Sequence, residues 1–142
     1  MVKYPVGTRV EVIGHSAGFW NSYFGATVIH NYQNMVLVRY KELIDNHGER
    51  LEEMVKLKHV RPYHPRVDQR FNEGDDVDVW DGAGWWRGRV ILERQQDLVV
   101  YFKYMKKKNE RHHPYEREHV RTHMESCDLG GATAWVHIKI DP

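Results

Sequence analysis

The sequence predicts an all-β protein built from two small barrels packed in tandem. Three observations lead to this fold class: the chain repeats itself once, apolar and polar residues alternate with a period of two, and helical periodicity is nowhere sustained. About 60 residues of short antiparallel strands per copy are best closed as a small barrel, because closure leaves no unpaired strand edge. The 142 residues, 41% of them hydrophobic, suit one ordinary domain or two very small ones.

The internal repeat rests on four pairs of matching segments. These are residues 4–12 with 71–79, 23–28 with 85–90, 36–40 with 98–102, and 59–62 with 119–122. The offset between the copies shortens along the chain, so the second copy has the shorter loops. Loops absorb such length changes, whereas strands do not.

Each copy is expected to contain, in order, a strand, an aromatic loop, two more strands, a polar stretch and a closing strand. In the first copy Val10 and Val12 alternate with charged residues, and the same pattern returns in VLVRY, residues 36–40. The loop HSAGFWNS separates the first two strands. The polar stretch LIDNHGERLEEMV, residues 43–55, has room for a turn of helix before the closing strand at 59–62.

We place the first domain at residues 1–65 and the second domain, with a strand-like tail, at residues 66–142. The connector YHPRVDQR is short and contains Pro65, so we expect the barrels to touch rather than swing freely. The tail has a Gly-Gly break followed by AWVHIKI, which has no equivalent in the first copy. It pairs back either on the second barrel or with the connector.

The charges are balanced overall but unevenly placed. With 21 basic and 20 acidic residues the net charge is +1, so the chain lacks the excess that drives non-specific nucleic-acid binding. The segment EGDDVDVWD, residues 73–81, is acidic, and KKKNERHH, residues 106–113, is strongly basic. The first patch suits a basic partner and the second an acidic one.

Several classes of protein and site are not expected. No apolar run approaches the roughly 20 residues of a membrane span, and the N-terminus lacks a signal-peptide layout, so we expect a soluble intracellular protein or a segment of a longer chain. One cysteine, Cys127, excludes an internal disulfide framework. Although His119, His123 and Cys127 recur at every fourth residue, His119 falls in a predicted strand, where such side chains do not converge on a metal. Phosphate loops, nucleophile elbows and zinc-protease motifs do not occur in the sequence, so we expect no enzyme, cofactor or metal.

An aromatic residue is predicted on the outer face at the same place in both copies. Alternation puts Trp86 in the second core and Trp85 outside with Arg87, because successive strand residues point to opposite faces. The same rule puts Phe24 inside and Tyr23 outside. A thin barrel easily buries one ring of each pair in its core. The position of the other ring, on the outer face, needs a different explanation.

Further aromatic residues are expected near Tyr23, since the loops at one end of a small barrel cluster in space. We expect a cage with a carboxylate at its rim, formed by Phe19, Trp20, Tyr23, Tyr40 and Asp45. Such a cage suits a methylated ammonium, because ring faces attract the cation and the acid takes a remaining N–H. The alternative is that these rings pack against one another or against the second barrel.

The motifs also resemble a known family. GTRVEV, GFWNSYFGATV, LVRYKEL, LEEMV and HVRP resemble the first unit of a tandem Agenet (plant Tudor-like) module, and GDDVDVWDGAGWWRGRV, VVYF and HVRTHMES resemble its second. The resemblance covers nearly the whole chain and implies SH3-like/Tudor-like barrels of the Royal superfamily packed as a pair. It further implies a nuclear chromatin reader, similar to plant heterochromatin proteins that recognise histone H3 dimethylated on lysine 9, with the cage on the first barrel. Two positions depart from the family pattern, Tyr23 where Trp is usual and Trp20 where a polar residue is common.

The resemblance implies the N-terminal tail of histone H3 as the partner of a monomeric module. Because that tail is rich in Lys and Arg, its binding calls for carboxylates beside the cage. The expected acidic contacts are Glu42, Glu49, Glu52, Asp76 and Asp78. The alternative is that these charges only solvate the surface.

Nucleic-acid binding is the rival interpretation. The segment YFKYMKKKNERHH, residues 101–113, interleaves aromatic residues with Lys106, Lys107 and Lys108, as a surface for RNA or single strands does. A solvated basic hairpin explains the same segment. A protein-interaction module without preference for methylation is a third interpretation.

Overall fold

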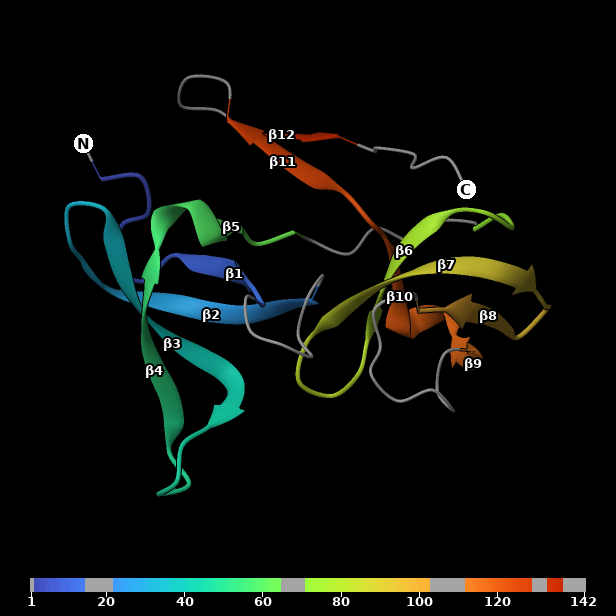
Figure 1. The fold of residues 1–142 in the computed structure, drawn as a ribbon, viewed down its shortest axis with the longest axis horizontal. Helices are drawn as coiled ribbons and strands as arrows, with labels where there is room; N and C mark the ends of the chain where they lie inside the picture. Colours follow the sequence, from blue (N-terminus) through green and yellow to red (C-terminus); the bar gives the residue numbers. More distant parts are fainter. Residues whose placement is uncertain (1, 15–21, 65–70, 103–111, 129–132, 137–142) are drawn as a thin grey trace.

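The computed structural model describes residues 2–14, 22–64, 71–102, 112–128 and 133–136, and within them it confirms the all-β class (Figure 1). The first barrel contains β1 (Arg9–Ile13), β2 (Ser22–Asn31), β3 (Met35–Ile44), β4 (Arg50–Lys56), the 3-10 turn η1 (Leu57–His59) and β5 (Val60–Pro62). The second contains β6 (Asp76–Trp80), β7 (Trp85–Glu93), β8 (Asp97–Tyr101), β9 (His112–Glu116), the 3-10 turn η3 (Arg117–His119) and β10 (Val120–Thr122). Among the described residues, no helix is long and apolar enough to cross a membrane.

The polar stretch 43–55 forms a strand hairpin and not the turn of helix for which it has room. β4 pairs antiparallel with β3, with Val36 opposite Val55 and Leu37 opposite Met54. The reason is the spacing of its apolar residues: Leu51 and Val55 lie an even number of positions apart and face the first core together. In the described part of the first barrel, the helical turn is η1, which follows this strand.

The two barrels share one continuous sheet. Its strands run in the order β10-β6-β7-β2-β1-β5, and the junction is a short antiparallel pairing of β2 with β7, in which Ser22 lies opposite Trp86 and Tyr23 opposite Trp85. The barrels therefore touch, as expected from the short connector.

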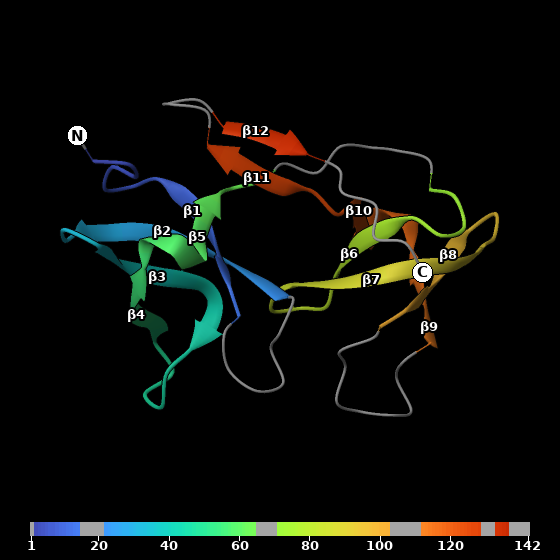
Figure 2. The ribbon, with the colours of Figure 1, turned by 45° about the horizontal axis from the view of Figure 1, so that its top comes forward.

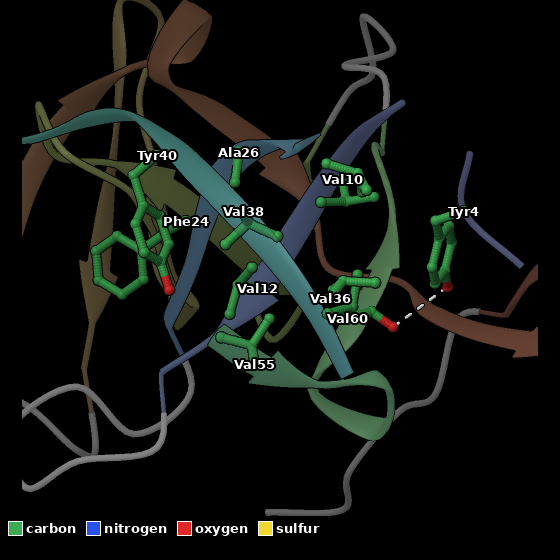
Figure 3. Packing of buried hydrophobic residues seen from close by; sticks show 11 residues of the cluster. Tyr4, Val10, Val12, Phe24, Ala26, Val36, Val38, Tyr40, Val55 and Val60 are labelled. Carbon is green, nitrogen blue, oxygen red and sulfur yellow. Dashed lines mark hydrogen bonds between the residues drawn. The ribbon is translucent and has the colours of Figure 1, made fainter. Parts of the chain in front are cut away.

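Each barrel has its own apolar core. The first core contains valines from β1 to β5 with Tyr4, Phe24 and Tyr40, and Figure 3 shows how they fill the space between the strands. The second core contains Phe71, Phe102 and the inward residues of β6, β7, β8 and β10. Trp86 packs against both cores, in agreement with its predicted inward position.

The tail forms a separate two-stranded sheet of β11 (Glu125–Asp128) and β12 (Thr133–Val136). It lies beside β1 and β5 of the first barrel in both views (Figures 1 and 2). Trp135 of β12 stacks on His64 of the connector with ring centroids 4.6 Å apart. The strand-like segment of the tail therefore pairs with β11, which is neither of the two expected alternatives, and its contact with the connector is the stack on His64.

Candidate functional site

Four charged side chains form a buried cluster where the barrels meet. Arg121 donates hydrogen bonds to Glu11 at 2.7 Å and to Asp78 at 2.9 Å, and Arg61 donates to Glu11 at 2.9 Å. The repeat makes the cluster nearly symmetric, because Glu11 and Asp78 are equivalent positions, as are Arg61 and Arg121. Each acid thus faces arginines of both barrels, since the guanidinium of Arg61 also lies 4.0 Å from the carboxylate of Asp78.

The two aromatic residues predicted on the outer face are platforms for these arginines. The guanidinium carbon of Arg61 lies 3.5 Å from the centre of the Tyr23 ring, and that of Arg121 lies 4.2 Å from the centre of the Trp85 ring. Tyr23 is only 6% exposed, and burial raises its pKa to about 12. Trp85, expected to be exposed, is half-buried. The outer face is therefore assigned correctly, but in both copies an arginine covers it.

His123 extends the cluster to the tail. It is fully buried, and its two ring nitrogens lie 2.7 Å from a carboxylate oxygen of Asp78 and 2.6 Å from one of Glu125. Burial alone would lower the pKa of His123, but the hydrogen bonds with both carboxylates outweigh it and raise the pKa. Burial would raise the pKa of Asp78, but the hydrogen bond and charge of His123, with the charges of both arginines, lower it.

The end of the first barrel brings together two rings and an acid. The rings of Phe24 and Tyr40 are perpendicular, with an interplanar angle of 89° and centroids 6.5 Å apart, and Figure 3 shows them side by side at one end of the core. The Tyr40 hydroxyl donates to Glu53 at 2.9 Å. Glu53 lies opposite the buried Val38, so it projects from the core side of the sheet and is half-buried. Burial, with the charge and hydrogen bond of Glu53, raises the pKa of Tyr40.

Tyr23 and Tyr40 do not line one pocket, contrary to the expected cage. Tyr40 lies opposite Ala26 in the β2–β3 ladder and shares the core side with it. Tyr23 is three positions before Ala26 on β2, so it faces the other side of the sheet and meets Arg61. The ring that accompanies Tyr40 is Phe24.

The acid expected at the cage rim has a different role. Asp45 caps the β3–β4 turn, where its carboxylate accepts backbone N–H bonds from His47 at 2.8 Å and Glu49 at 3.1 Å. The acid beside Tyr40 is Glu53, which the strand alternation of LEEMV would have indicated had that segment been read as a strand. Phe19 and Trp20 lie outside the described residues.

Three of the five expected acidic contacts already have basic partners. Asp78 is fully buried and bonded to Arg121 and His123, so it is not available to a ligand. Asp76 is buried with its carboxylate 3.6 Å from Arg87, and Glu52 forms an exposed pair with Arg39 at 2.8 Å. Glu42 and Glu49 are exposed. Lys106, Lys107 and Lys108, named for the nucleic-acid alternative, lie outside the described residues.

A groove of about 440 Å³ separates the outer face of the first barrel from the β6–β7 hairpin. Its floor is formed by residues of β2, including Gly25, and its far side by Trp80 and Trp85. These two indoles pack edge to face, with centroids 5.4 Å apart. The groove is also lined by two kinds of basic residue, the cations Arg9, Arg39, Lys41 and Arg50 and the imidazole His119, and by Tyr40 and Glu42.

Among the described residues, one group of side chains has the spacing of a metal site. Glu116, Glu118 and His119 bring one potential ligand atom each within 4.8 Å of one another. All three are exposed, and the hydrogen bond and charge of Glu118 raise the pKa of Glu116. Exposed acidic groups of this kind are common without an ion, so no metal is assigned to them.

Two small barrels that share one sheet, with aromatic and acidic residues at a barrel end, define a tandem Tudor-like binding module. Residues 7–65 match the Agenet domain family, and the chain as a whole is similar to solved tandem Agenet structures. Agenet domains are binding modules and not catalytic ones.

Two curated Arabidopsis thaliana proteins are similar to this chain. It is 32% identical over 129 residues to Protein AGENET DOMAIN (AGD)-CONTAINING P1, a match covering 88% of this chain and 24% of that protein. It is 31% identical over 142 residues to DUF724 domain-containing protein 3, covering 93% of this chain and 19% of that protein. The chain thus spans a quarter or less of the length of these relatives.

Solved structures support the tandem arrangement. The crystal structure of Arabidopsis thaliana AGDP1 AGD34 superposes with a TM-score of 0.81 and 29% identity, covering 93% of this chain and 89% of that one. The crystal structure of ADCP1 tandem Agenet domain 3-4 gives a TM-score of 0.72 and 28% identity, covering 87% and 82%. Both span the two barrels together.

Proposed function

We propose that this chain is a chromatin reader that binds a methylated lysine of the histone H3 tail, with dimethylated lysine 9 as the preferred mark. The observation that carries the proposal is the position of Glu53, a half-buried acid beside the perpendicular rings of Phe24 and Tyr40. The match to the Agenet domain family supports a binding role, and a nuclear location follows from the proposed partner.

The chemistry of this group favours a methylated ammonium. A methylated ammonium is weakly hydrated, so it loses little when it leaves water for the face of an aromatic ring. A carboxylate beside the rings adds a negative charge and a hydrogen-bond acceptor. Tyr40 engages only one oxygen of Glu53, and the other oxygen has no hydrogen bond to any described residue. That oxygen can accept the N–H which mono- and dimethylammonium retain and trimethylammonium lacks. The geometry therefore favours the lower methylation states.

Entry of the ligand requires some rearrangement of the barrel end. Phe24 is 6% and Tyr40 is 4% exposed, so their faces are covered until neighbouring side chains move apart. Phe19 and Trp20 belong to the segment that leads into β2, and we keep them in the proposal as further walls. Glu42 and Glu49 are the exposed acids that remain for unmodified basic residues of the tail.

The test is a calorimetric titration with H3 peptides that are unmodified or mono-, di- or trimethylated at lysine 9, with peptides methylated at lysine 4 and lysine 36 for comparison. Glu53→Gln keeps an acceptor for the Tyr40 hydroxyl but removes the charge. We expect it to weaken dimethyllysine binding by about tenfold, the equivalent of about 1.4 kcal/mol.

The matched control is Glu52→Gln, which changes the neighbouring exposed acid that pairs with Arg39. Its dissociation constant should stay within about twofold of the original, because an exposed pair contributes little. Binding that ignores methylation, or equal affinities of the Glu53→Gln and unaltered proteins, would remove the barrel end as the site.

A further inference from the structure

We propose that the groove between the barrels is a second binding site, which takes single-stranded nucleic acid and borders the barrel-end group at Tyr40. Three features of the groove support this assignment: a glycine floor, an indole wall and a basic wall. None of them belongs to the segment 101–113 on which the sequence-based nucleic-acid alternative depends.

The floor is open where a side chain would normally stand. Gly25 lies within the ten-residue strand β2, at a position whose side chain would point into the groove. A Cβ atom built there meets no heavy atom within 4 Å, and the backbone does not adopt a positive φ. Neither packing nor conformation therefore requires glycine, and a strand glycine of this kind often marks the close approach of a ligand.

The far wall offers aromatic surface. Trp80 and Trp85 are both half-buried and line the groove, and Arg121 lies over the ring of Trp85. This contact fixes the indole, so it does not have to be ordered when a ligand binds. Fixed aromatic rings are the surfaces on which unpaired bases stack, irrespective of sequence.

The near wall carries the charge that a phosphate backbone needs. Lys41 and Arg50 are exposed, and neither side chain forms an ion pair or hydrogen bond with the described part of the chain. Arg9 stacks on Tyr63 and Arg39 pairs with the exposed Glu52, so both guanidinium groups remain at the surface.

Of the acids on the groove, Glu11 is already neutralised by two arginines. Glu42 and Glu118 are the exposed carboxylates that remain. These two carboxylates reduce the positive potential of the groove. We therefore expect an oligonucleotide to bind with moderate affinity that falls as the salt concentration rises.

The indole wall and the basic wall together favour one kind of anionic ligand over others. A double helix keeps its bases stacked and paired, so their faces are not available to Trp80, whereas a single strand can place a base on the indole and its phosphates toward Lys41. An acidic peptide would use the basic wall but would gain little from the indoles. Single-stranded nucleic acid is the occupant that uses all three features.

The experiment measures fluorescence anisotropy of short labelled oligo(dT) and oligo(U) at several salt concentrations. Gly25→Leu adds side-chain volume at the floor, where its Cβ atom meets no heavy atom within 4 Å, and we expect it to weaken binding by about tenfold. Lys41→Gln should lower the slope of log affinity against log salt by about one, as the loss of one phosphate contact does. Gly25→Ala, which leaves most of the groove open, should bind nearly as the unaltered protein.

Two controls separate the groove from other sites. Lys56→Gln removes an exposed charge of β4 that does not line the groove, and it should leave the affinity unchanged. Gly25→Leu should retain binding of methylated histone peptide, so failure of one site is distinguishable from failure of the other. Oligonucleotide binding that is undetectable, insensitive to Gly25→Leu, or weaker than that of an acidic peptide would overturn the proposal.

Discussion

Arg61 and Arg121 each donate a hydrogen bond to the backbone carbonyl that lies three residues beyond the other. Arg61 donates to the carbonyl of Met124 at 2.7 Å, and Arg121 donates to the carbonyl of His64 at 3.1 Å. The two arginines occupy equivalent positions of the repeat, so the exchange is reciprocal. These two bonds join the last strand of each barrel to the segment that follows the last strand of the other barrel.

Arg121→Met should strongly destabilise the protein. The methionine keeps much of the side-chain volume but leaves Glu11 with one arginine and Asp78 without its closest one, inside a buried cluster. Removing one partner from a buried ion pair costs about 3 to 5 kcal/mol, because an uncompensated charge remains. Urea denaturation gives the loss in the free energy of unfolding.

The control for Arg121→Met is Arg94→Met. Arg94 donates to Asp97 at 2.6 Å in a solvent-exposed pair, so its removal should hardly move the urea midpoint. Similar small shifts for both variants would show that the buried cluster contributes no more than a surface pair.

The stability contributed by this cluster should be greatest between about pH 4 and pH 6.5. The pKa of Asp78 is lowered in the folded protein, so its contribution is complete above the unfolded value of about 3.9 and is lost as the pH falls through the folded value. The pKa of His123 is raised, so its contribution is complete below about 6.5 and is lost as the pH rises through the folded value. Urea midpoints measured from below pH 4 to above about pH 6.5 test both limits.

His123→Gln isolates the alkaline limit. Glutamine has no charge to lose, so the decline above about pH 6.5 should become shallower in this variant. The acid decline should become smaller too, because His123 helps to lower the pKa of Asp78 and Glu125, and the part due to the two arginines beside Asp78 should remain. A stability that rises steadily from neutral to alkaline pH would contradict a buried imidazolium between two carboxylates.

The sequence predicted the face of each aromatic residue but not what covers that face. Alternation places Tyr23 outside its own barrel and Trp86 inside, and both assignments agree with the structure. That Arg61 then covers Tyr23 depends on how two barrels meet, and no local pattern within one barrel specifies that geometry. The equivalence of Glu11 with Asp78 and of Arg61 with Arg121 was a usable signal, since charged residues recurring on strands at matching places indicate a paired role.

The acid at the barrel end was not assigned to the cage rim for a different reason. Glu53 belongs to LEEMV, and reading this segment as a strand puts Glu53 on the same face as Leu51 and Val55. Its position beside Tyr40 depends in addition on the register of β4 with β3, in which Glu53 lies opposite Val38. Register is set by contacts between strands, so this position could not be predicted from the segment alone.

Two glycine-to-alanine substitutions should have opposite effects. At Gly88 a Cβ atom would lie 2.5 Å from a side-chain carbon of Val100 and 3.0 Å from the backbone oxygen of Tyr101, so Gly88→Ala should destabilise the protein by about 1 to 3 kcal/mol. At Gly25 it meets nothing, so Gly25→Ala should be neutral or stabilise by up to about 1 kcal/mol. Thermal unfolding of the two variants checks the difference, and equal shifts would contradict it.

Trp86→Ala should destabilise both barrels by removing one shared side chain. Trp86 packs against both cores and meets Phe24 edge to face at 6.4 Å, and truncation of such a ring costs about 3 to 5 kcal/mol. Trp80→Ala is the control, because Trp80 lines the groove and lies outside both cores. In hydrogen exchange, Trp86→Ala should reduce the protection of β1 and β2 as well as that of β6 and β7. If only the second barrel lost protection, the first core would not depend on this ring, and the shared sheet would be the main mechanical link between the barrels.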